Sequence, residues 1–370
     1  MINLFYASFI PGLQNLIAEV IKERLPDAKI LKLLDGAVLF ETETSYDKLN
    51  FFCFNNIFAV INIMEEQKRS DNVLEKHIKT FINGGCNFNE DVIINNSKNF
   101  KTFRIVVSNE NTPSAIEEKL RLEAERYITK LSGLKVNRSL PDTEFWFLYR
   151  TERSKTDNEN PLNNFSIFMK RLTLRSSWEK TLHKGELPPP LAWVLCRLAN
   201  LTHGDTVLDP FCGYGSIPQE AVKHFHVTKF IACDNNKEAA LFSEQRFSKR
   251  KKGEFTLHGC DFCELLSKIE EKSIDVIVTD PPWGHFGVSE EARNEKGIEN
   301  NDQRDFLFKM FEVFGKLLKD GGRAAVLYAN DDRLLKAAPP CFKLKGKMPV
   351  LLSGKKAVIY SFLFTAENTE

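Results

Sequence analysis

The sequence lacks the features of a membrane or secreted protein. Among its 370 residues, no run approaches the ~20 consecutive apolar residues of a membrane-spanning helix. The first residues, Met1 to Tyr6, include no basic region of the kind that begins a signal peptide. The eight cysteines are scattered and do not form a disulfide framework, so we expect a reducing, cytoplasmic environment without a membrane partner.

Metal-ligand patterns are equally sparse. Cys260 and Cys263 form one Cys-x-x-Cys pair, but a zinc site would need a second pair of ligands at suitable spacing. We therefore interpret both residues as structural thiols and predict no metal. Low-complexity segments and long repeats are also missing from the sequence.

An excess of charge is missing too. The chain has 51 basic and 50 acidic residues, a net charge of +1, so any nucleic-acid binding must use local patches. The patch in residues 246–252 lies at a predicted helix end, and the alternating lysines in residues 343–347 could share one strand face. We take Lys170, Arg171 and Arg175, which lie between the two halves of the chain, as the candidate nucleic-acid contacts. Each patch could instead be an ordinary solvated surface.

The tetrapeptide Asp280-Pro281-Pro282-Trp283 follows residues 274–279, which read as a buried strand. Ligands of open α/β sheets bind at the carboxyl ends of such strands. The Asp280 carboxylate and the Pro281 carbonyl can accept the two hydrogens of an exocyclic amine, and the prolines stiffen the turn. Trp283 can stack a base, a contact worth about 1–3 kcal/mol. These four residues are the predicted catalytic group for a guanine N2 or adenine N6. The alternative is an ordinary strand-ending turn with a buried Trp.

Residues 206–217 read as a strand, a tight glycine-rich turn and the start of a helix. Glycine permits close approach of the backbone to a ligand, and the start of a helix offers free N–H groups. The turn has neither the Gly-Lys-Ser/Thr ending of an ATPase loop nor the full G-x-G-x-x-G pattern. The candidate cofactor residues in this stretch are Asp209, Phe211, Cys212, Gly213, Gly215 and Ser216.

The next two predicted strands also end in acids. Asp234, followed by Asn235, is placed to take the hydroxyls of a ribose. Asp261, followed by Phe262, could accept a hydrogen bond from an adenine N6. Four consecutive strands therefore bring an acid to one sheet edge: Asp209, Asp234, Asp261 and Asp280.

The motifs Asp-Pro-Phe-Cys-Gly at 209–213 and Asp-Pro-Pro-Trp at 280–283 together resemble those of class I S-adenosylmethionine-dependent amino-methyltransferases. The resemblance covers roughly residues 183–370. It implies a Rossmann-type methyltransferase domain with S-adenosylmethionine as cofactor. The usual family form has Ser and Thr where this chain has Tyr214 and Ser216.

The first half of the chain reads as small α+β units, of which the first has a ferredoxin-like pattern. Strands are expected at residues 4–9, 28–34, 37–41, 57–64, 102–108, 134–136, 144–151 and 164–172. Helices are expected at residues 13–24, 46–52, 72–81 and 115–131. The polar residues 152–160 are interpreted as a hairpin loop.

Two such units ahead of an amino-methyltransferase resemble the THUMP-containing RNA methyltransferases, which implies contact with a tRNA acceptor end. The tripeptides at 11–13 and 103–105 fit this family. The segment 183–190, which includes Pro188, resembles the part of the family that packs over the cofactor. The predicted α/β architecture is a ferredoxin-like domain at 1–60, a THUMP-like RNA-binding domain at 61–172, a linker at 173–186 and a Rossmann-fold methyltransferase domain at 187–370. The sheet of the last domain is expected to be mostly parallel, with a final antiparallel strand at residues 357–364.

The expected function is methylation of a guanosine N2 in structured RNA, with tRNA as the first candidate. Asp280 would orient the amine, and Trp283 would hold a base turned out of its stack. The alternatives are N6-adenine methylation of DNA or RNA, and an RNA-binding scaffold with an inactive domain. The sequence implies no activator subunit. Residues 284–303 are expected to fold over the base, or else to be ordered by the neighbouring domain.

Overall fold

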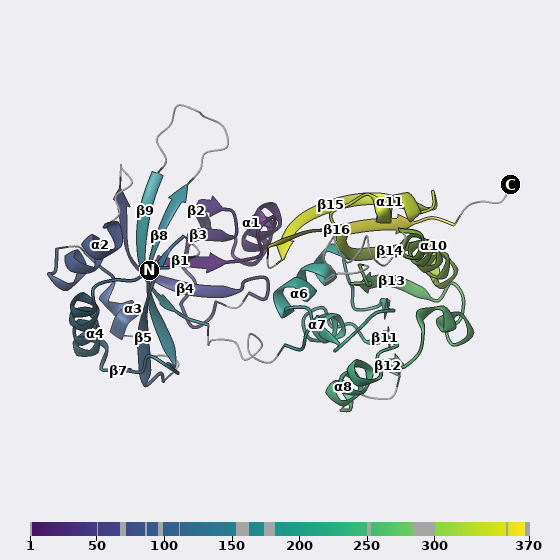
Figure 1. Ribbon diagram of the computed structural model, residues 1–370, viewed down its shortest axis with the longest axis horizontal. Coiled ribbons are helices and arrows are strands. Elements are labelled where there is room, and N and C mark those ends of the chain that lie inside the picture. Colours follow the sequence, from purple (N-terminus) through teal and green to yellow (C-terminus); the bar gives the residue numbers. More distant parts are fainter. Residues whose placement is uncertain are drawn as a thin grey trace, which may run out of the picture. The chain divides into compact units, whose positions relative to one another are not determined.

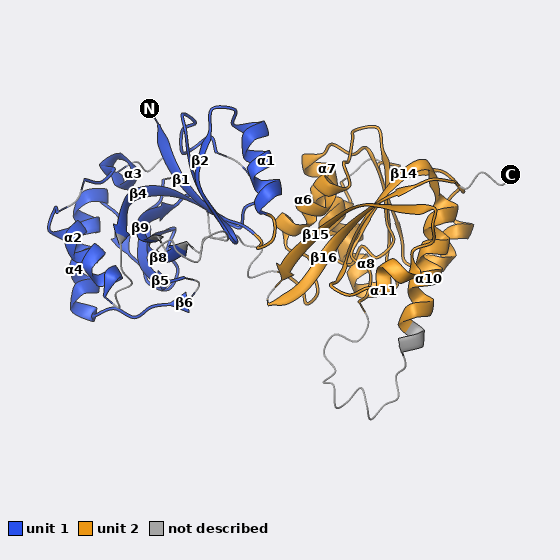
Figure 2. Cartoon of the chain, turned by 90° about the horizontal axis from the view of Figure 1, so that it is seen from above, with its two compact units in different colours: residues 1–9, 14–177 blue, residues 10–13, 178–370 orange. Residues whose placement is uncertain are grey.

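The computed structural model divides into two compact units, Met1–Phe9 with Gln14–Ser177 (unit 1) and Ile10–Leu13 with Trp178–Glu370 (unit 2) (Figures 1 and 2). No helix in the described part of the chain is long and apolar enough to cross a membrane. The structure describes residues 2–49, 51–66, 72–85, 87–94, 99–110, 112–152, 163–173, 182–249, 253–283, 300–352 and 354–366.

Unit 1 is built on one nine-stranded sheet with the order β2-β3-β1-β4-β9-β8-β5-β6, to which β7 adds beside β5. Its central strand β4 pairs antiparallel with β1 on one side and with β9 on the other. The predicted boundary at residue 60 therefore falls inside a strand, and the two predicted N-terminal domains share this sheet. The strands are β1 (Asn3–Ser8), β2 (Lys29–Leu34), β3 (Ala37–Thr42), β4 (Asn56–Glu66), β5 (Thr102–Asn109), β6 (Thr112–Pro113), β7 (Lys135–Val136), β8 (Thr143–Glu152) and β9 (Asn163–Arg171).

The helices of unit 1 are α1 (Gln14–Arg24), α2 (Val73–Ile82), α3 (Glu90–Ile94) and α4 (Glu118–Ser132). Aromatic side chains join α2 to the sheet, because Phe81 lies 4.5 Å from Phe168 between ring centroids and Phe168 stacks on Phe147 at 4.2 Å. The strand order β2-β3-β1-β4 is that of a ferredoxin-like unit. The helix expected at 46–52 is wrong, because residues 46–48 form a turn. The short α3 was not foreseen.

Unit 2 holds a seven-stranded sheet with the order β12-β11-β10-β13-β14-β16-β15. The strands from β12 to β14 are parallel, whereas β16 runs antiparallel to β14, as the sequence predicts. The strands are β10 (Thr206–Asp209), β11 (Lys229–Cys233), β12 (Phe255–His258), β13 (Ile274–Thr279), β14 (Leu318–Ala329), β15 (Phe342–Leu352) and β16 (Lys355–Phe364).

Helices cover both faces of this sheet, with α6 and α7 on one side and α10 and α11 on the other (Figure 2). Such double coverage explains why the central strands are largely apolar, as in β13, where Ile274 and residues 276–278 are buried. Prolines begin α6, where their missing N–H costs nothing. The helical elements are α6 (Pro189–Leu198), α7 (Ser216–His224), α8 (Lys237–Phe247), the 3-10 helix η1 (Phe262–Ser267), α10 (Asn300–Leu317) and α11 (Arg333–Ala337).

The short segment Ile10–Leu13 belongs to unit 2. The Pro11 carbonyl accepts a hydrogen bond of 3.1 Å from the Leu351 N–H of β15. Gly12 has φ +99°, and a Cβ at this position would overlap the Pro349 carbonyl. The turn at 11–13 therefore requires glycine for two independent reasons.

Candidate active site

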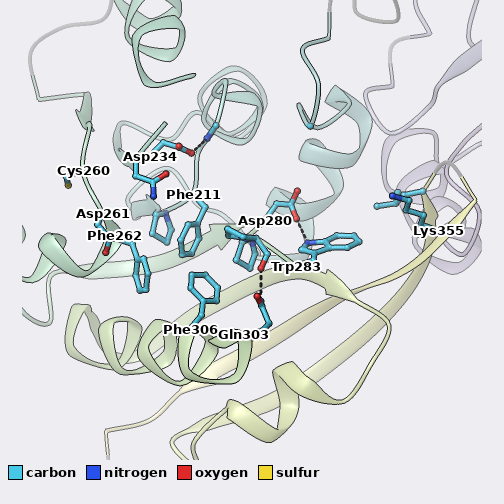
Figure 3. Close-up of a pocket in the computed structure, with 17 residues that line it drawn as sticks. Phe211, Asp234, Cys260, Asp261, Phe262, Asp280, Trp283, Gln303, Phe306 and Lys355 are labelled. Carbon is cyan, nitrogen blue, oxygen red and sulfur yellow. Dashed lines mark hydrogen bonds between the residues drawn. The ribbon is translucent and has the colours of Figure 1, made fainter. Parts of the chain in front are cut away.

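The strand order of unit 2 reverses at β10, which has β11 on one side and β13 on the other. Open α/β sheets bind ligands at such a switch point, beyond the carboxyl ends of the strands. A cavity of about 850 Å³ lies there (Figure 3). It is lined by Gly185, Pro210, Phe211, Gly213, Asp234, Asn235, Cys260, Asp261, Phe262, Asp280, Pro281, Pro282, Trp283, Gln303, Phe306, Leu352 and Lys355.

Asp234 fixes the glycine-rich turn on one side of the cavity. Its Oδ2 accepts a hydrogen bond of 2.7 Å from Gly213 N, and its Oδ1 accepts one of 2.8 Å from Asn236 N. Gly213 and Gly215 both have positive φ, at 51° and 84°. Each carboxylate oxygen has a second lone pair, so Asp234 can still accept hydroxyl groups of a ligand while it holds the turn.

Gly215 precedes α7 and packs against α8. A Cβ on Gly215 would lie 2.7 Å from Ser243 Oγ, whereas a Cβ on Gly213 would meet nothing within 4 Å. The two glycines therefore differ in purpose. Gly215 allows α7 and α8 to approach, while Gly213 leaves open space next to the cavity.

Asp209 lies beneath the cavity and is fully buried. Its Oδ1 accepts hydrogen bonds from Thr279 Oγ1 at 2.7 Å and from Phe211 N at 3.2 Å, so it ties the end of β10 to the end of β13. Its Oδ2 has no hydrogen-bond partner in the described structure. Burial raises the pKa of Asp209 to about 8, and the two hydrogen bonds offset part of that rise. Asp209 thus positions the site from below and does not line it.

The turn at residues 280–283 orients its own carboxylate through a hydrogen bond. Trp283 Nε1 donates a hydrogen bond of 2.7 Å to Asp280 Oδ1, and Figure 3 shows the two side chains together. Burial raises the pKa of Asp280 to about 7, and the bond from Trp283 offsets part of the rise. The indole of Trp283 is partly buried, with its ring centroid 6.3 Å from that of Tyr328.

Gln303 braces this turn from α10. Its Nε2 donates to the Pro282 carbonyl and to the Tyr328 hydroxyl, both at 2.9 Å. Because the two prolines lack N–H groups, this side chain supplies a hydrogen bond that the turn cannot make with its own backbone. Gln303 therefore restrains the direction in which the neighbouring carbonyls point.

Three aromatic rings form an apolar wall of the cavity. Phe211, Phe262 and Phe306 are in mutual contact, with centroid distances of 5.1 to 5.6 Å. Figure 3 shows them between the Asp261 side and the Asp280 side of the cavity. A flat apolar wall of this kind suits the face of a purine.

The segment before α6 is tied to the start of α7 and to α8 through Glu186. Glu186 Oε1 accepts from Ser216 Oγ at 3.2 Å and from Arg246 at 2.9 Å, and Oε2 accepts from His183 N at 3.1 Å. The ring of His183 stacks on Tyr214 at 4.0 Å. The segment that was expected to cover the cofactor thus reaches the cavity through Gly185, while Ser216 and Arg246 hold Glu186 in place.

The sequence predictions and the cavity agree in part. The predicted residues that line it are Phe211, Gly213, Asp234, Asn235, Asp261, Phe262, Asp280, Pro281, Pro282 and Trp283. The predicted residues that do not line it are Pro188, Asp209, Cys212, Gly215 and Ser216. Asp209, Cys212, Gly215 and Ser216 are buried where β10 ends and α7 begins, and Pro188 is half-buried at the start of α6.

Seven residues that line the cavity were not among the named site residues, although Gln303 ends the segment expected to fold over the base: Gly185, Pro210, Cys260, Gln303, Phe306, Leu352 and Lys355. Pro210 and Cys260 adjoin predicted residues, and Gly185 lies in the segment expected to cover the cofactor. Gln303, Phe306, Leu352 and Lys355 come from α10 and the β15–β16 hairpin, and no local motif marks them. Cys260 Sγ lies 3.7 Å from Cys233 Sγ.

Two of the three predicted RNA contacts, Lys170 and Arg171, do not face solvent. Lys170 is 2% exposed and donates to the carbonyls of Val92 and Ile93, and burial lowers its pKa to about 8. Arg171 is 5% exposed and pairs with Glu144 at 3.1 Å. This placement argues against phosphate contact by either side chain. Arg175 lies outside the described residues, as do residues 153–160 of the loop predicted at 152–160 and most of the predicted covering segment at 284–303.

The charge of the cavity lining decides whether a cationic nucleoside cofactor fits. Asp234, Asp261 and Asp280 line it together with a single cation among the described lining residues, Lys355. An acidic cavity favours a sulfonium cation, and the phenylalanine wall favours an adenine. The residues present therefore fit S-adenosylmethionine.

Comparison with known proteins agrees with this geometry. Residues 176–341 match the family model described as "UPF0020: RMKL-like, methyltransferase domain". The chain is 27% identical over 278 residues to the tRNA (guanine(10)-N2)-dimethyltransferase of Methanocaldococcus jannaschii, covering 71% of this chain and 72% of that protein. It is 33% identical over 122 residues to the probable tRNA (guanine(10)-N2)-dimethyltransferase of Methanothermococcus thermolithotrophicus, covering 30% of this chain and 69% of that protein.

The fold is also found among solved structures. The crystal structure of TrmN from Thermus thermophilus superposes with a TM-score of 0.71 at 19% identity, over 98% of this chain and 99% of that one. The likeness extends over both units and supports the α/β architecture expected from the sequence.

Proposed function

The chain belongs to the UPF0020, RMKL-like methyltransferase family, and on this premise we propose that it methylates the exocyclic N2 of a guanosine in tRNA, with S-adenosylmethionine as cofactor. Relatives named for guanine-N2 methylation of tRNA support the choice of base and of RNA. The observation that carries the proposal is the Asp280 carboxylate, held by Trp283 at the rim of an acidic and aromatic cavity.

The cofactor half of the cavity lies on the side of β10, β11 and β12. S-adenosylmethionine, when bound, supplies an electrophilic methyl group. Asp234 would accept the ribose hydroxyls, and Asp261 would accept from the adenine amine. The wall of Phe211, Phe262 and Phe306 would pack against the adenine ring.

The acceptor half lies at the catalytic turn. Asp280 and the Pro281 carbonyl would accept the two N–H bonds of the guanine N2, which aims the nitrogen lone pair away from them. Trp283 would contact the base, and Gln303 would keep the Pro282 carbonyl and the turn in place. The rate of methyl transfer is raised mainly by positioning, because the amine needs to lose its proton only after the new bond forms.

The carboxylate form of Asp280 is the hydrogen-bond acceptor, so its protonation state sets the pH dependence. With a pKa of about 7, the fraction in the carboxylate form rises as pH increases through neutrality. Methyl transfer should therefore increase over the same range and then level off.

We further propose that unit 1 docks the RNA and that the protein works in the cytoplasm. Its position ahead of a methyltransferase unit resembles the domain order of RNA methyltransferases that carry a separate RNA-binding half. The seven cysteines that the structure describes are free, which suits a reducing compartment.

The proposal is tested by incubating the protein with labelled S-adenosylmethionine and total RNA from a strain that lacks the gene. Mass spectrometry of digested nucleosides then identifies the product. Label in N2-methylguanosine of tRNA, mapped to one position, is the expected result. Label in N6-methyladenosine would replace the guanine assignment, and cofactor binding without any transfer would favour a scaffold.

A further inference from the structure

The β15–β16 hairpin carries an unusual share of positive charge. Between Phe342 and Phe364 the sequence has no Asp or Glu, although the whole chain has almost equal numbers of acids and bases. Five lysines lie in this stretch, and all five are exposed: Lys343, Lys345, Lys347, Lys355 and Lys356.

These lysines differ from others on the surface of unit 2. Lys268, Lys309 and Lys316 each pair with a glutamate on their own helical turn. In the described parts of the chain, no carboxylate forms an ion pair with Lys343, Lys345, Lys347 or Lys356. Among the described residues, these four hairpin lysines therefore carry positive charge that no carboxylate compensates.

The tip of the hairpin reaches the active site. Leu352 and Lys355, which pair across the tip, both line the catalytic cavity. Figure 3 shows Lys355 on β16 beyond the indole of Trp283. Alternation along β16 places Lys355 and Lys356 on opposite faces, so the positive charge surrounds the tip.

The predicted single face of lysines on β15 is wrong in detail. The register shifts between Leu344 and Gly346, so Lys345 is the extra residue of a bulge. Lys347 stands opposite Tyr360 and lies over its ring, with Nζ 5.8 Å from the ring centroid. The cations therefore follow the edge and the tip of the hairpin and do not form one flat row.

We propose that the β15–β16 hairpin binds the phosphate backbone of the RNA next to the nucleotide that enters the cavity. The inference rests on the proposed function, since it needs an RNA substrate. The acids Asp234, Asp261 and Asp280 repel a phosphodiester, so the backbone needs cations at the rim to bring a base this close. Lys355 is placed at that rim, and Lys347 and Lys356 continue the positive surface away from it.

A structural role makes a different prediction. β15 is an edge strand, and lysines on edge strands discourage pairing with other chains. If this were their only role, their removal would promote aggregation and leave the salt dependence of RNA binding unchanged.

The test uses the full chain with the substitutions Lys347→Gln, Lys355→Gln and Lys356→Gln together. Affinity for tRNA from a strain lacking the gene is measured over a series of salt concentrations. Each lost phosphate contact should flatten the slope of log K against log salt by about 0.7 to 0.9. The slope of the triple variant should therefore be shallower by about two. Cofactor affinity should stay unchanged in the double variant Lys347→Gln and Lys356→Gln, because neither residue lines the cavity. The corresponding arginine variant should retain the slope, and Lys356→Gln alone should reduce it by less than one unit.

The matched control is Lys268→Gln, Lys309→Gln and Lys316→Gln, which removes the same number of exposed lysines from unit 2. It should bind tRNA with the slope of the unmodified protein. An equal loss in both variants, or an unchanged slope in the hairpin variants, would overturn the proposal. If the unmodified protein methylates tRNA while the hairpin variants keep their slope, only the hairpin assignment fails. If the unmodified protein neither binds nor methylates tRNA, the proposed function fails with it.

Discussion

Trp283 Nε1 donates a hydrogen bond of 2.7 Å to Asp280 Oδ1 within the same turn. The aromatic residue at the end of this motif therefore has a second task besides contacting a base. It orients the carboxylate and favours its charged form, which burial otherwise disfavours.

Replacing Trp283 with Phe keeps a flat ring and removes the N–H donor. The pKa of Asp280 should then rise further above its ordinary value. A hydrogen bond to a charged group contributes about 1.5–3 kcal/mol, or roughly one to two pH units. The pH profile of kcat/KM should shift by that amount toward alkaline pH, with activity recovering at high pH. A profile that falls in height without moving would mean that Trp283 acts on the base alone.

Asp209 should make the cofactor-free protein less stable as pH rises. Its pKa is about 8 in the folded protein and about 3.9 in an unfolded chain, so the folded state binds the proton more tightly between these values. Stability is therefore lost as pH increases through this window. Asp209→Asn mimics the protonated acid and should flatten the decline, by on the order of a few kcal/mol at alkaline pH.

Urea unfolding at acidic and at alkaline pH measures this effect. Asp280 contributes a decline of the same sign up to about pH 7, so the Asp209→Asn variant should retain part of the slope. An identical pH dependence in the variant and the unmodified protein would show that Asp209 does not take up a proton on folding.

Substitution of the two glycines of the turn, Gly213 and Gly215, should have different effects. Both have positive φ, so an alanine costs about 1 kcal/mol of stability at either position. Gly215→Ala must also displace Ser243, and its melting temperature should fall further than that of Gly213→Ala. Gly213→Ala should fold but bind cofactor more weakly, because the added methyl lies next to the cavity. Equal stability loss with equal cofactor affinity would contradict the assignment.

Asp234→Ala should weaken cofactor binding by about one to two decades, from the loss of hydrogen bonds to a charged group. It also frees the Gly213 and Asn236 N–H groups, so the turn should loosen. Asp275→Ala is the matched control, because Asp275 lies at the start of β13 and pairs with Lys319. The control should lower stability with unchanged cofactor affinity, as titration calorimetry can show.

The sequence predicted those parts of the fold and the site that depend on residues close together in the chain. Buried strands followed by an acid predicted the sheet edge with Asp234 and Asp280, because strand and turn signals lie within a few residues. The antiparallel final strand was also expected, and β16 pairs with β14 in this sense.

Features that depend on residues far apart in the sequence were predicted wrongly or missed. Lys170 and Arg171 read as surface cations, since nothing beside them in the sequence shows that Glu144 and the carbonyls of α3 enclose them. Gln303 lies 21 residues after Pro282 and reaches the turn at residues 280–283 through tertiary packing alone. Lys355 reaches the same cavity only because β16 inserts between β14 and β15.

We expect Asp280 to act on the acceptor amine and not on the cofactor, and Asp280→Ala tests this role most directly. Methyl transfer to tRNA under single-turnover conditions and cofactor binding by calorimetry are measured on the same preparation. The structure predicts that transfer falls by at least about two decades while cofactor affinity changes by less than threefold or so. Near-normal transfer, or loss of transfer that merely follows loss of cofactor binding, would contradict it.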